Sequence, residues 1–181
     1  MANIHQTAIV EDGATLGDGV QIGPYCIVSA DVNLGDGVVL DSHVVIDGRT
    51  TIGPNCRIFP FAAIGTAPQD TKYAEEPSEL IIGANNIIRE HVTIHRSNTP
   101  DEDTIIGTGN FFMAHSHVGH NSVVGDHNTF ANGALIAGHV EIADRVFVAG
   151  NCLVHQFVRI GKLALMQGGA AISKDLAPYT I

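Results

Sequence analysis

An apolar residue recurs at every sixth position along most of the chain, and this period constrains the fold more than any other feature. The apolar series covers three segments, residues 4–64, 82–94 and 106–172. A period of six fits neither an α-helix, which repeats every ~3.6 residues, nor a β-strand, which repeats every ~2 residues. Each hexad is therefore expected to form a short strand followed by a corner.

Small residues accompany the apolar positions. Glycine often follows them, as in Ile22-Gly23 and Ile52-Gly53, and the position two residues before them is usually small or β-branched. The chain has 20 glycines and no tryptophan, which suits tight turns around a narrow core. This position, two residues before the apolar residue, also holds all three cysteines. We expect them to be core residues: Cys26, Cys56 and Cys152.

Three hexads make one triangular coil, and the strands of successive coils are expected to lie about 4.8 Å apart. A β-sandwich would instead place its turns roughly 8 to 12 residues apart. We therefore predict an all-β chain in which residues 1–181 form one parallel β-helix, a hexapeptide-repeat solenoid.

Two stretches interrupt the apolar series. Residues 66–81 place Asp70 and Glu76 where apolar residues are due, and residues 97–105 place Pro100 there. Both stretches keep the count of six, so it is the charged and proline residues that indicate a departure from the solenoid. We predict two external loops, and long loops in a compact domain are often functional.

The charge of the chain excludes several classes of partner. The formal net charge is −10, the isoelectric point is near 5.3, and the nine Lys and Arg residues form no basic run. Nucleic acid is therefore not an expected partner. No apolar stretch approaches the ~18 residues of a membrane span, and the first residues do not resemble a secretion signal. A cytoplasmic location is expected.

Histidine is the residue type that the repeat does not require. Six of the ten histidines fall within residues 111–155. Counting in coils of three hexads places Gly138 one coil beyond His120, and Gln156 one coil beyond Gly138. His139 and His155 are their chain neighbours. The sequence therefore predicts a polar groove along one edge of the prism.

A neutral histidine beside a free glycine N–H suits acyl transfer to a hydroxyl group. The imidazole of His120 can accept the hydroxyl proton, and the N–H of Gly138 can stabilise the oxyanion that develops on the carbonyl. The alternative is that a histidine simply lies on the polar surface and has no chemical role. That alternative applies best to the isolated histidines, namely His5, His43, His91 and His127.

The segment from residue 113 to residue 161, with TKYAEEP and VTIHR upstream, resembles the UDP-N-acetylglucosamine 3-O-acyltransferase family of lipid A biosynthesis. The shared motifs are HxxH, AGH and VHQF, and the resemblance covers essentially the whole chain. It implies a left-handed β-helix and transfer of an (R)-3-hydroxyacyl group from acyl carrier protein to the sugar 3-hydroxyl. It implies no cofactor, no metal, and a homotrimer with active sites between subunits. Such an interface would explain the apolar bulk of Phe111, Phe112 and Phe130.

The resemblance also implies roles for individual residues. His120 takes the position of the general base, and Gly138 that of the oxyanion-hole donor. Gly168 falls where the family limits acyl-chain length, and Lys72 would offer a positive charge to a phosphate or to the acidic carrier protein. The substrate-positioning residues implied by the family motifs are Gln69, Asp70, Lys72, His95, His117, His139, His155 and Gln156.

Two features depart from the family pattern. Members commonly carry an aspartate directly after the catalytic histidine, whereas this chain has Asn121, which can orient the ring but brings no charge. The sequence stops at Ile181, where the family continues into further coils and a helical C-terminal domain. From that end we expect a truncated or shortened relative of the family, or in the extreme case a scaffold without activity.

A different class of enzyme shares the repeat. His115 and His120 form an H-x4-H pair, and a third histidine from a neighbouring subunit would complete a zinc site of the γ-carbonic-anhydrase type. The upstream histidine ligand of that family has no counterpart here. Stoichiometric zinc in the purified protein would favour this alternative.

Overall fold

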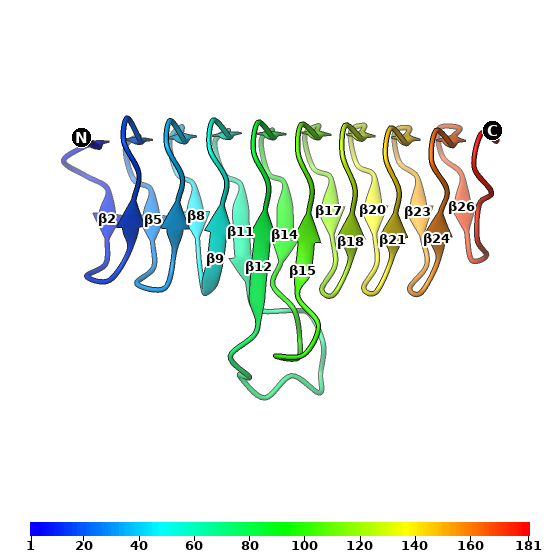
Figure 1. The fold of residues 1–181 in the computed structure, drawn as a ribbon, viewed down its shortest axis with the longest axis horizontal. Helices are drawn as coiled ribbons and strands as arrows, with labels where there is room; N and C mark the ends of the chain where they lie inside the picture. Colours follow the sequence, from blue (N-terminus) through cyan, green and yellow to red (C-terminus); the bar gives the residue numbers. More distant parts are fainter.

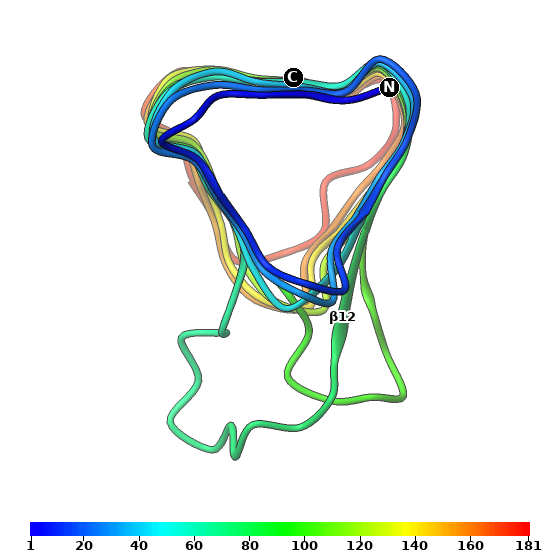
Figure 2. The same cartoon turned by 90° about the vertical axis from the view of Figure 1, so that its left-hand side faces the viewer.

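The chain forms a three-sided solenoid. The computed structural model describes all 181 residues and contains 26 short parallel strands in three sheets. Figure 1 shows the coils stacked along one axis with the termini at opposite ends, and Figure 2 shows the triangular cross-section. The architecture is the parallel β-helix that the period of six predicted, and its left-handed winding is the one that the family resemblance implied.

Each sheet takes one strand from every coil. The first sheet contains β1 (Asn3–Ile4), β4 (Gln21–Ile22), β7 (Val39–Leu40), β10 (Arg57–Ile58), β13 (Ile87–Ile88), β16 (Phe111–Phe112), β19 (Thr129–Phe130), β22 (Phe147–Val148) and β25 (Leu165–Met166). The second sheet contains β2 (Ile9–Val10), β5 (Ile27–Val28), β8 (Val45–Ile46), β11 (Ala63–Thr66), β14 (Thr93–His95), β17 (His117–Val118), β20 (Leu135–Ile136), β23 (Leu153–Val154) and β26 (Ala171–Ile172). The third sheet contains β3 (Thr15–Leu16), β6 (Asn33–Leu34), β9 (Arg49–Ile52), β12 (Glu79–Ile82), β15 (Thr104–Ile106), β18 (Val123–Val124), β21 (Glu141–Ile142) and β24 (Arg159–Ile160).

The register of the sheets gives the coil length. His117 pairs with Leu135, three hexads further along the chain. Thr93 pairs with His117 after four hexads, and Ala63 pairs with Thr93 after five. The first loop therefore adds two hexads to its coil and the second loop adds one. The register is kept across both insertions except at the end of β11, where it shifts after Ile64 and Thr66 pairs with His95.

Both loops leave the same corner of the prism, the corner between the second and third sheets (Figure 2). We call it the loop-bearing corner; beyond the loops it consists of residues 119–122, 137–140 and 155–158. The strands leave residues 67–78 and 96–103 outside the sheets. The sequence-based bounds, 66–81 and 97–105, each include residues that pair in strands. Charged and polar residues such as Glu79 and Thr104 pair in strands here, and the apolar series of the sequence cannot mark them as strand residues.

The core is a single cluster of 37 buried apolar residues that runs the length of the solenoid. It contains most residues of the apolar series. It also contains many of the residues that lie two positions before a member of that series, and all three cysteines are among these. Phe112 and Phe130 are fully buried, with parallel rings 4.7 Å apart. The sequence-based view of them as outward-facing bulk was wrong, because every sixth position points inward; of the three phenylalanines only Phe111 lies on the outer surface.

Histidine and asparagine are frequent at the corners because many corner residues adopt the left-handed backbone conformation. Sixteen residues other than glycine have a positive φ, and five of them are histidines. Asparagine and histidine are among the residues that tolerate this region best. The five histidines with positive φ are His43, His91, His115, His127 and His139. Their enrichment is thus partly a property of the fold.

Candidate active site

His120 and Gly138 lie in direct contact on the loop-bearing corner. His120 follows β17, and Gly138 occupies the next coil, where its missing side chain leaves room for the imidazole. A Cβ on Gly138 would lie 2.9 Å from Nε2 and 2.8 Å from Cε1 of His120. The N–H of Gly138 donates no hydrogen bond within the chain. A basic nitrogen and a free N–H donor are therefore adjacent, as the coil count predicted.

The other nitrogen of the His120 ring contacts Asn121. Nδ1 lies 2.7 Å from the side-chain oxygen of Asn121. Asn121 is buried and has a φ of 58°, and its own backbone N–H donates to the hydroxyl of Thr104 at 2.8 Å. The corner therefore orients the ring of His120 and directs Nε2 towards Gly138.

His117 and His95 form the inner wall of the site. Their rings meet edge to face with centroids 4.8 Å apart, and Nδ1 of His117 lies 2.7 Å from the hydroxyl of Thr93. His95 is only 5% exposed, and burial, with the nearby His117, lowers its pKa to about 4. Burial also lowers the pKa of His117, with a further contribution from His120. Both rings are held neutral.

His139 forms the opposite wall. Its ring meets His120 edge to face at 5.2 Å and stacks on Phe157 at 4.8 Å. Nδ1 of His139 lies 3.8 Å from the carboxylate of Glu102. Burial lowers the pKa of His139 and His120 lowers it further, while Glu102 and Asp70 oppose the shift. Sequence analysis missed Phe157, although it lies one coil after His139.

The first loop contacts the second above this corner. A carboxylate oxygen of Asp70 accepts a hydrogen bond from the backbone of Lys72 at 3.0 Å, and the other accepts from the side chain of Asn98 at 2.8 Å. The hydrogen bond from Lys72, followed by that from Asn98, lowers the pKa of Asp70. Gln69 and Lys72 are exposed. Asn98 was not predicted, since a loop asparagine gives no pattern in sequence.

Three predicted residues lie outside this cluster. His155 and Gln156 are exposed on the loop-bearing corner one coil beyond Gly138, and Nδ1 of His155 lies 3.1 Å from the backbone oxygen of Gln156. Gly168 lies on another corner, between the first and second sheets, with only the oxygen of Gly150 near a built Cβ, at 3.6 Å. Within one chain these residues do not meet the ring of His120.

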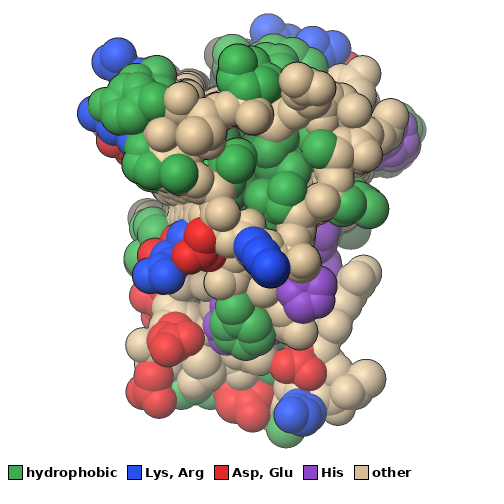
Figure 3. All heavy atoms as spheres, turned by 90° about the vertical axis from the view of Figure 1, so that its right-hand side faces the viewer, with side chains coloured by type: hydrophobic (Ala, Val, Ile, Leu, Met, Phe, Trp, Pro, Cys, Tyr) green, Lys and Arg blue, Asp and Glu red, His purple; other side chains and the backbone are tan.

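A groove of about 710 Å³ runs beside the histidines. Its lining includes Asn121, His139 and Phe157 together with four carboxylates, those of Asp101, Glu102, Asp103 and Glu141. Figure 3 views the C-terminal end of the solenoid and shows acidic side chains gathered in the part where the loops project. The groove is open to solvent and acidic along the second loop.

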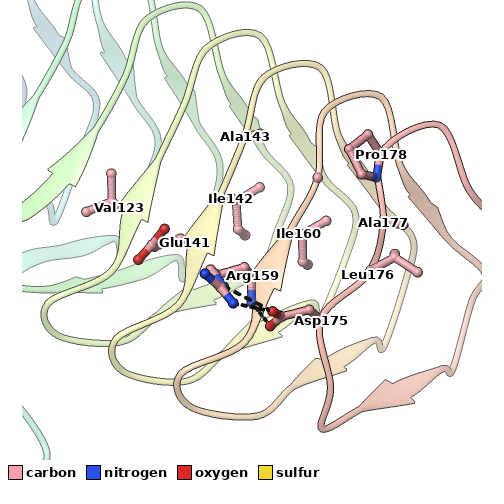
Figure 4. A pocket seen from close by; sticks show the side chains of 11 residues that line it. Val123, Glu141, Ile142, Ala143, Arg159, Ile160, Asp175, Leu176, Ala177 and Pro178 are labelled. Atoms are coloured by element: carbon pink, nitrogen blue, oxygen red, sulfur yellow. Dashed lines mark hydrogen bonds and ion pairs between the residues drawn. The ribbon is translucent and has the colours of Figure 1, made fainter.

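A second pocket lies on the third sheet beyond β24, lined by residues of β21, β24 and the last turn (Figure 4). Two of its charged groups pair with each other, since the guanidinium of Arg159 contacts the carboxylate of Asp175 at 2.8 Å and 3.0 Å. Leu176 pairs with Ile160 across it. The carboxylate of Glu141 also lines this pocket, as it lines the groove beside His139.

His115 does not join His120. It lies on the corner between the first and second sheets, where its ring stacks on His91 with centroids 4.8 Å apart. That column continues through three further rings, those of Tyr25, His43 and Phe61. No group of three His, Cys, Asp or Glu side chains in the chain is arranged to hold a metal ion. A zinc site would need ligands from a second subunit.

The fold and the histidine corner together define a hexapeptide-repeat transferase. The family model of the bacterial transferase hexapeptide matches residues 13–48 and 103–138. Among curated relatives, the acyl-[acyl-carrier-protein]–UDP-N-acetylglucosamine O-acyltransferase of Verminephrobacter eiseniae is 48% identical over 99% of this chain and 69% of its own length. The enzyme of that name from Helicobacter pylori is 49% identical over 99% of the chain and 67% of its own length. The chain belongs to this acyltransferase family.

Solved structures agree with the sequence comparison. A crystal structure of a UDP-N-acetylglucosamine acyltransferase superposes with a TM-score of 0.96 at 45% identity, covering 98% of this chain and 70% of the other. The UDP-N-acetylglucosamine acyltransferase from Campylobacter jejuni gives a TM-score of 0.93 at 40% identity, covering 97% and 69%. The resemblance drawn from the HxxH, AGH and VHQF motifs is thus confirmed.

The structure contains no helix with the length and apolar character needed to cross a membrane.

Proposed function

We propose that the chain transfers an (R)-3-hydroxyacyl group from acyl carrier protein to the 3-hydroxyl of UDP-N-acetylglucosamine, the first step of lipid A biosynthesis. Family membership supports the reaction class. The contact between the imidazole of His120 and the unpartnered N–H of Gly138 is the observation that carries the mechanism.

His120 acts as the general base in this proposal. Nε2 takes the proton of the sugar 3-hydroxyl as its oxygen attacks the thioester carbonyl, and the electron pair of the C=O bond moves onto the oxygen. The N–H of Gly138 stabilises that oxyanion. The tetrahedral intermediate collapses as the C–S bond breaks, and the proton on His120 passes to the leaving thiolate. Positioned acid–base catalysis of this kind contributes about 10²–10⁴-fold in rate.

The surrounding residues hold the substrates. His95 and His117 are kept neutral by burial, so they can hydrogen-bond a sugar without repelling the imidazolium that forms at His120. Lys72 lies exposed on the first loop and offers its ammonium to the diphosphate or to acidic acyl carrier protein. The remaining substrate-positioning residues are Gln69, Asp70, His139, His155 and Gln156.

A homotrimer brings the separated residues together. Gly168 lies on a different corner from His120, so its proposed role in limiting acyl length requires the neighbouring subunit to supply that corner. The outer row of the second sheet is largely apolar, with Ile9, Ile27, Leu135 and Leu153 at least 39% exposed. Such a row suits contact with a second copy. We also propose that the protein is cytoplasmic, as the sequence leads us to expect.

The decisive experiment replaces the base. His120→Gln should lower the turnover of 3-hydroxyacyl carrier protein with UDP-N-acetylglucosamine by about 10²-fold or more. His127→Gln is the matched control, because His127 is also a corner histidine but lies exposed on the corner opposite the second sheet. Full turnover by His120→Gln would disprove the assignment, and stoichiometric zinc in the active protein would favour the carbonic-anhydrase alternative.

A further inference from the structure

The side-chain amide of Asn121 is held in one orientation by two backbone groups. Nδ2 donates to the carbonyl oxygen of Glu102 at 2.9 Å, and Oδ1 accepts from the backbone N–H of Asn98 at 3.2 Å. A carbonyl oxygen can only accept, and a backbone N–H can only donate. Exchanging the oxygen and nitrogen of the amide would place an acceptor against an acceptor and a donor against a donor. The backbone therefore settles an assignment that is ordinarily ambiguous.

This orientation fixes the proton on His120. The atom of Asn121 that faces Nδ1 of His120 is Oδ1, at 2.7 Å, and it can only accept. Nδ1 of the neutral ring must then carry the hydrogen, and Nε2 keeps its lone pair. Nε2 is the nitrogen next to Gly138. The ring thus presents its basic nitrogen to the side where the hydroxyl must be deprotonated.

We propose that the second loop, residues 96–103, selects the Nδ1–H tautomer of His120 through the amide of Asn121, with Ser97 and Asn98 as positioning residues. The inference rests on the proposed role of His120 as the base and deepens it. The loop supplies every partner of the amide other than His120 itself. In the solenoid without these residues, the corner would offer none of them.

Ser97 anchors the arrangement from inside. It is fully buried, its hydroxyl accepts from Nδ2 of Asn121 at 2.8 Å, and it donates to the backbone oxygen of Thr99 at 2.7 Å. The backbone N–H of Thr99 donates a hydrogen bond to the same hydroxyl at 3.1 Å. This closed turn holds the adjacent Asn98 N–H in place against Asn121. Ser97 therefore acts on the ring only through the amide.

Asn98 connects the amide to a charge. Its side chain donates to the carboxylate of Asp70 at 2.8 Å, while its backbone donates to Asn121. An asparagine beside the base brings no charge of its own to stabilise the imidazolium. The chain Asp70–Asn98–Asn121–His120 supplies a carboxylate at the far end of three hydrogen bonds. The first loop, which carries Asp70, is thereby linked to the base.

The tautomer can be measured directly. Protein labelled with ¹⁵N-histidine gives separate Nδ1 and Nε2 signals in long-range ¹⁵N–¹H correlation spectra, and His120→Gln identifies the signals of His120. In the unaltered protein at a pH where the ring is neutral, we expect the Nδ1–H form of His120. A dominant Nε2–H form would overturn the proposal.

Deleting residues 98–103 tests the loop. The deletion removes the one added hexad and restores a coil of three hexads, so the strand register is retained. The tautomer preference of His120 should be lost, and kcat should fall about tenfold or more, since a ring in the wrong tautomer cannot act as base. An unchanged tautomer in a deletion variant with a retained melting temperature would overturn the proposal.

A point variant guards against misfolding of the deletion. Ser97→Ala should shift the tautomer ratio and lower kcat by about fivefold, the effect expected from one lost hydrogen bond. The control is Ser116→Ala, because Ser116 is equally buried but its hydroxyl has no partner; it should leave both readouts unchanged. Equal behaviour of the two variants would overturn the proposal. If His120→Gln keeps full turnover while the loop still controls the tautomer, only the proposed function fails.

Discussion

The imidazole of His120 fills the space in which Gly138 would carry a side chain. A Cβ built on Gly138 lies within 3.0 Å of two ring atoms of His120 and 3.1 Å from its backbone oxygen. The φ of Gly138 is not in the left-handed region, so the glycine is not required by its own backbone. It is required by the histidine of the preceding coil.

Gly138→Ala should therefore inactivate the enzyme without unfolding it. The added methyl group displaces the ring of His120, which can rotate, and partly covers the N–H of Gly138. We expect kcat to fall about 10²-fold, the size of effect seen when an oxyanion donor is lost. The melting temperature should change little. Turnover close to that of the unaltered protein would show that neither the ring position nor the N–H is used.

Acid should destabilise the fold through His95. Its pKa is about 4 in the folded chain, against an ordinary value of about 6.5. As the pH falls from about 6.5 to 4, the unfolded chain binds a proton that the folded chain does not, so the free energy of unfolding decreases by about 3 kcal/mol. The lowered pKa of His117 acts in the same direction.

The measurement is urea denaturation between pH 7.5 and pH 4.5, at one protein concentration because assembly contributes to stability. His95→Gln carries no titrating group at this position, so its midpoint should fall less steeply with pH. Parallel pH profiles for the two proteins would contradict the role given to His95. The expected difference is confined to pH values below about 6.5.

The stacked phenylalanines should dominate the stability of the central coils. Phe130→Ala leaves a cavity beside Phe112 and should lower the free energy of unfolding by about 3–5 kcal/mol. Phe147→Ala is the matched control, since Phe147 is in the neighbouring strand of the same sheet but is 39% exposed on the outer face. It should cost about 1 kcal/mol. Comparable losses for both variants would contradict the inward assignment.

Acyl length should depend on Gly168 if the proposed trimer is correct. Gly168 has an ordinary φ, and the nearest atom to a built Cβ is 3.6 Å away, so Gly168→Met fits the chain without strain. The side chain should shift the preference, measured as kcat/KM across acyl carrier proteins of different chain length, towards shorter acyl groups. Unchanged preference would remove Gly168 from the acyl pocket.

Much of this structure follows from the six-residue spacing along the chain, but the contacts between the loops and the corner do not. The period of six predicted the strands, and the coil of three hexads placed Gly138 beside His120 because parallel coils repeat at a fixed distance. The same count could have found Phe157 below His139. It could not find Ser97, Asn98 or Glu102, because these loop residues follow no repeat and reach Asn121 only when the loop folds back on the corner.

The sequence by itself determined the solenoid, its register and the histidine–glycine contact, since all three depend on a period that each coil repeats. It also carried the motifs that identified the family. The tertiary structure decided how the loops meet the site, and it showed that Phe112, a member of the six-residue series, faces the core. Hydrogen bonds between segments remote in sequence fix the orientation of Asn121, and no local pattern records them. For that reason the position of the proposed base was readable in the sequence, while the tautomer that we propose for its ring was not.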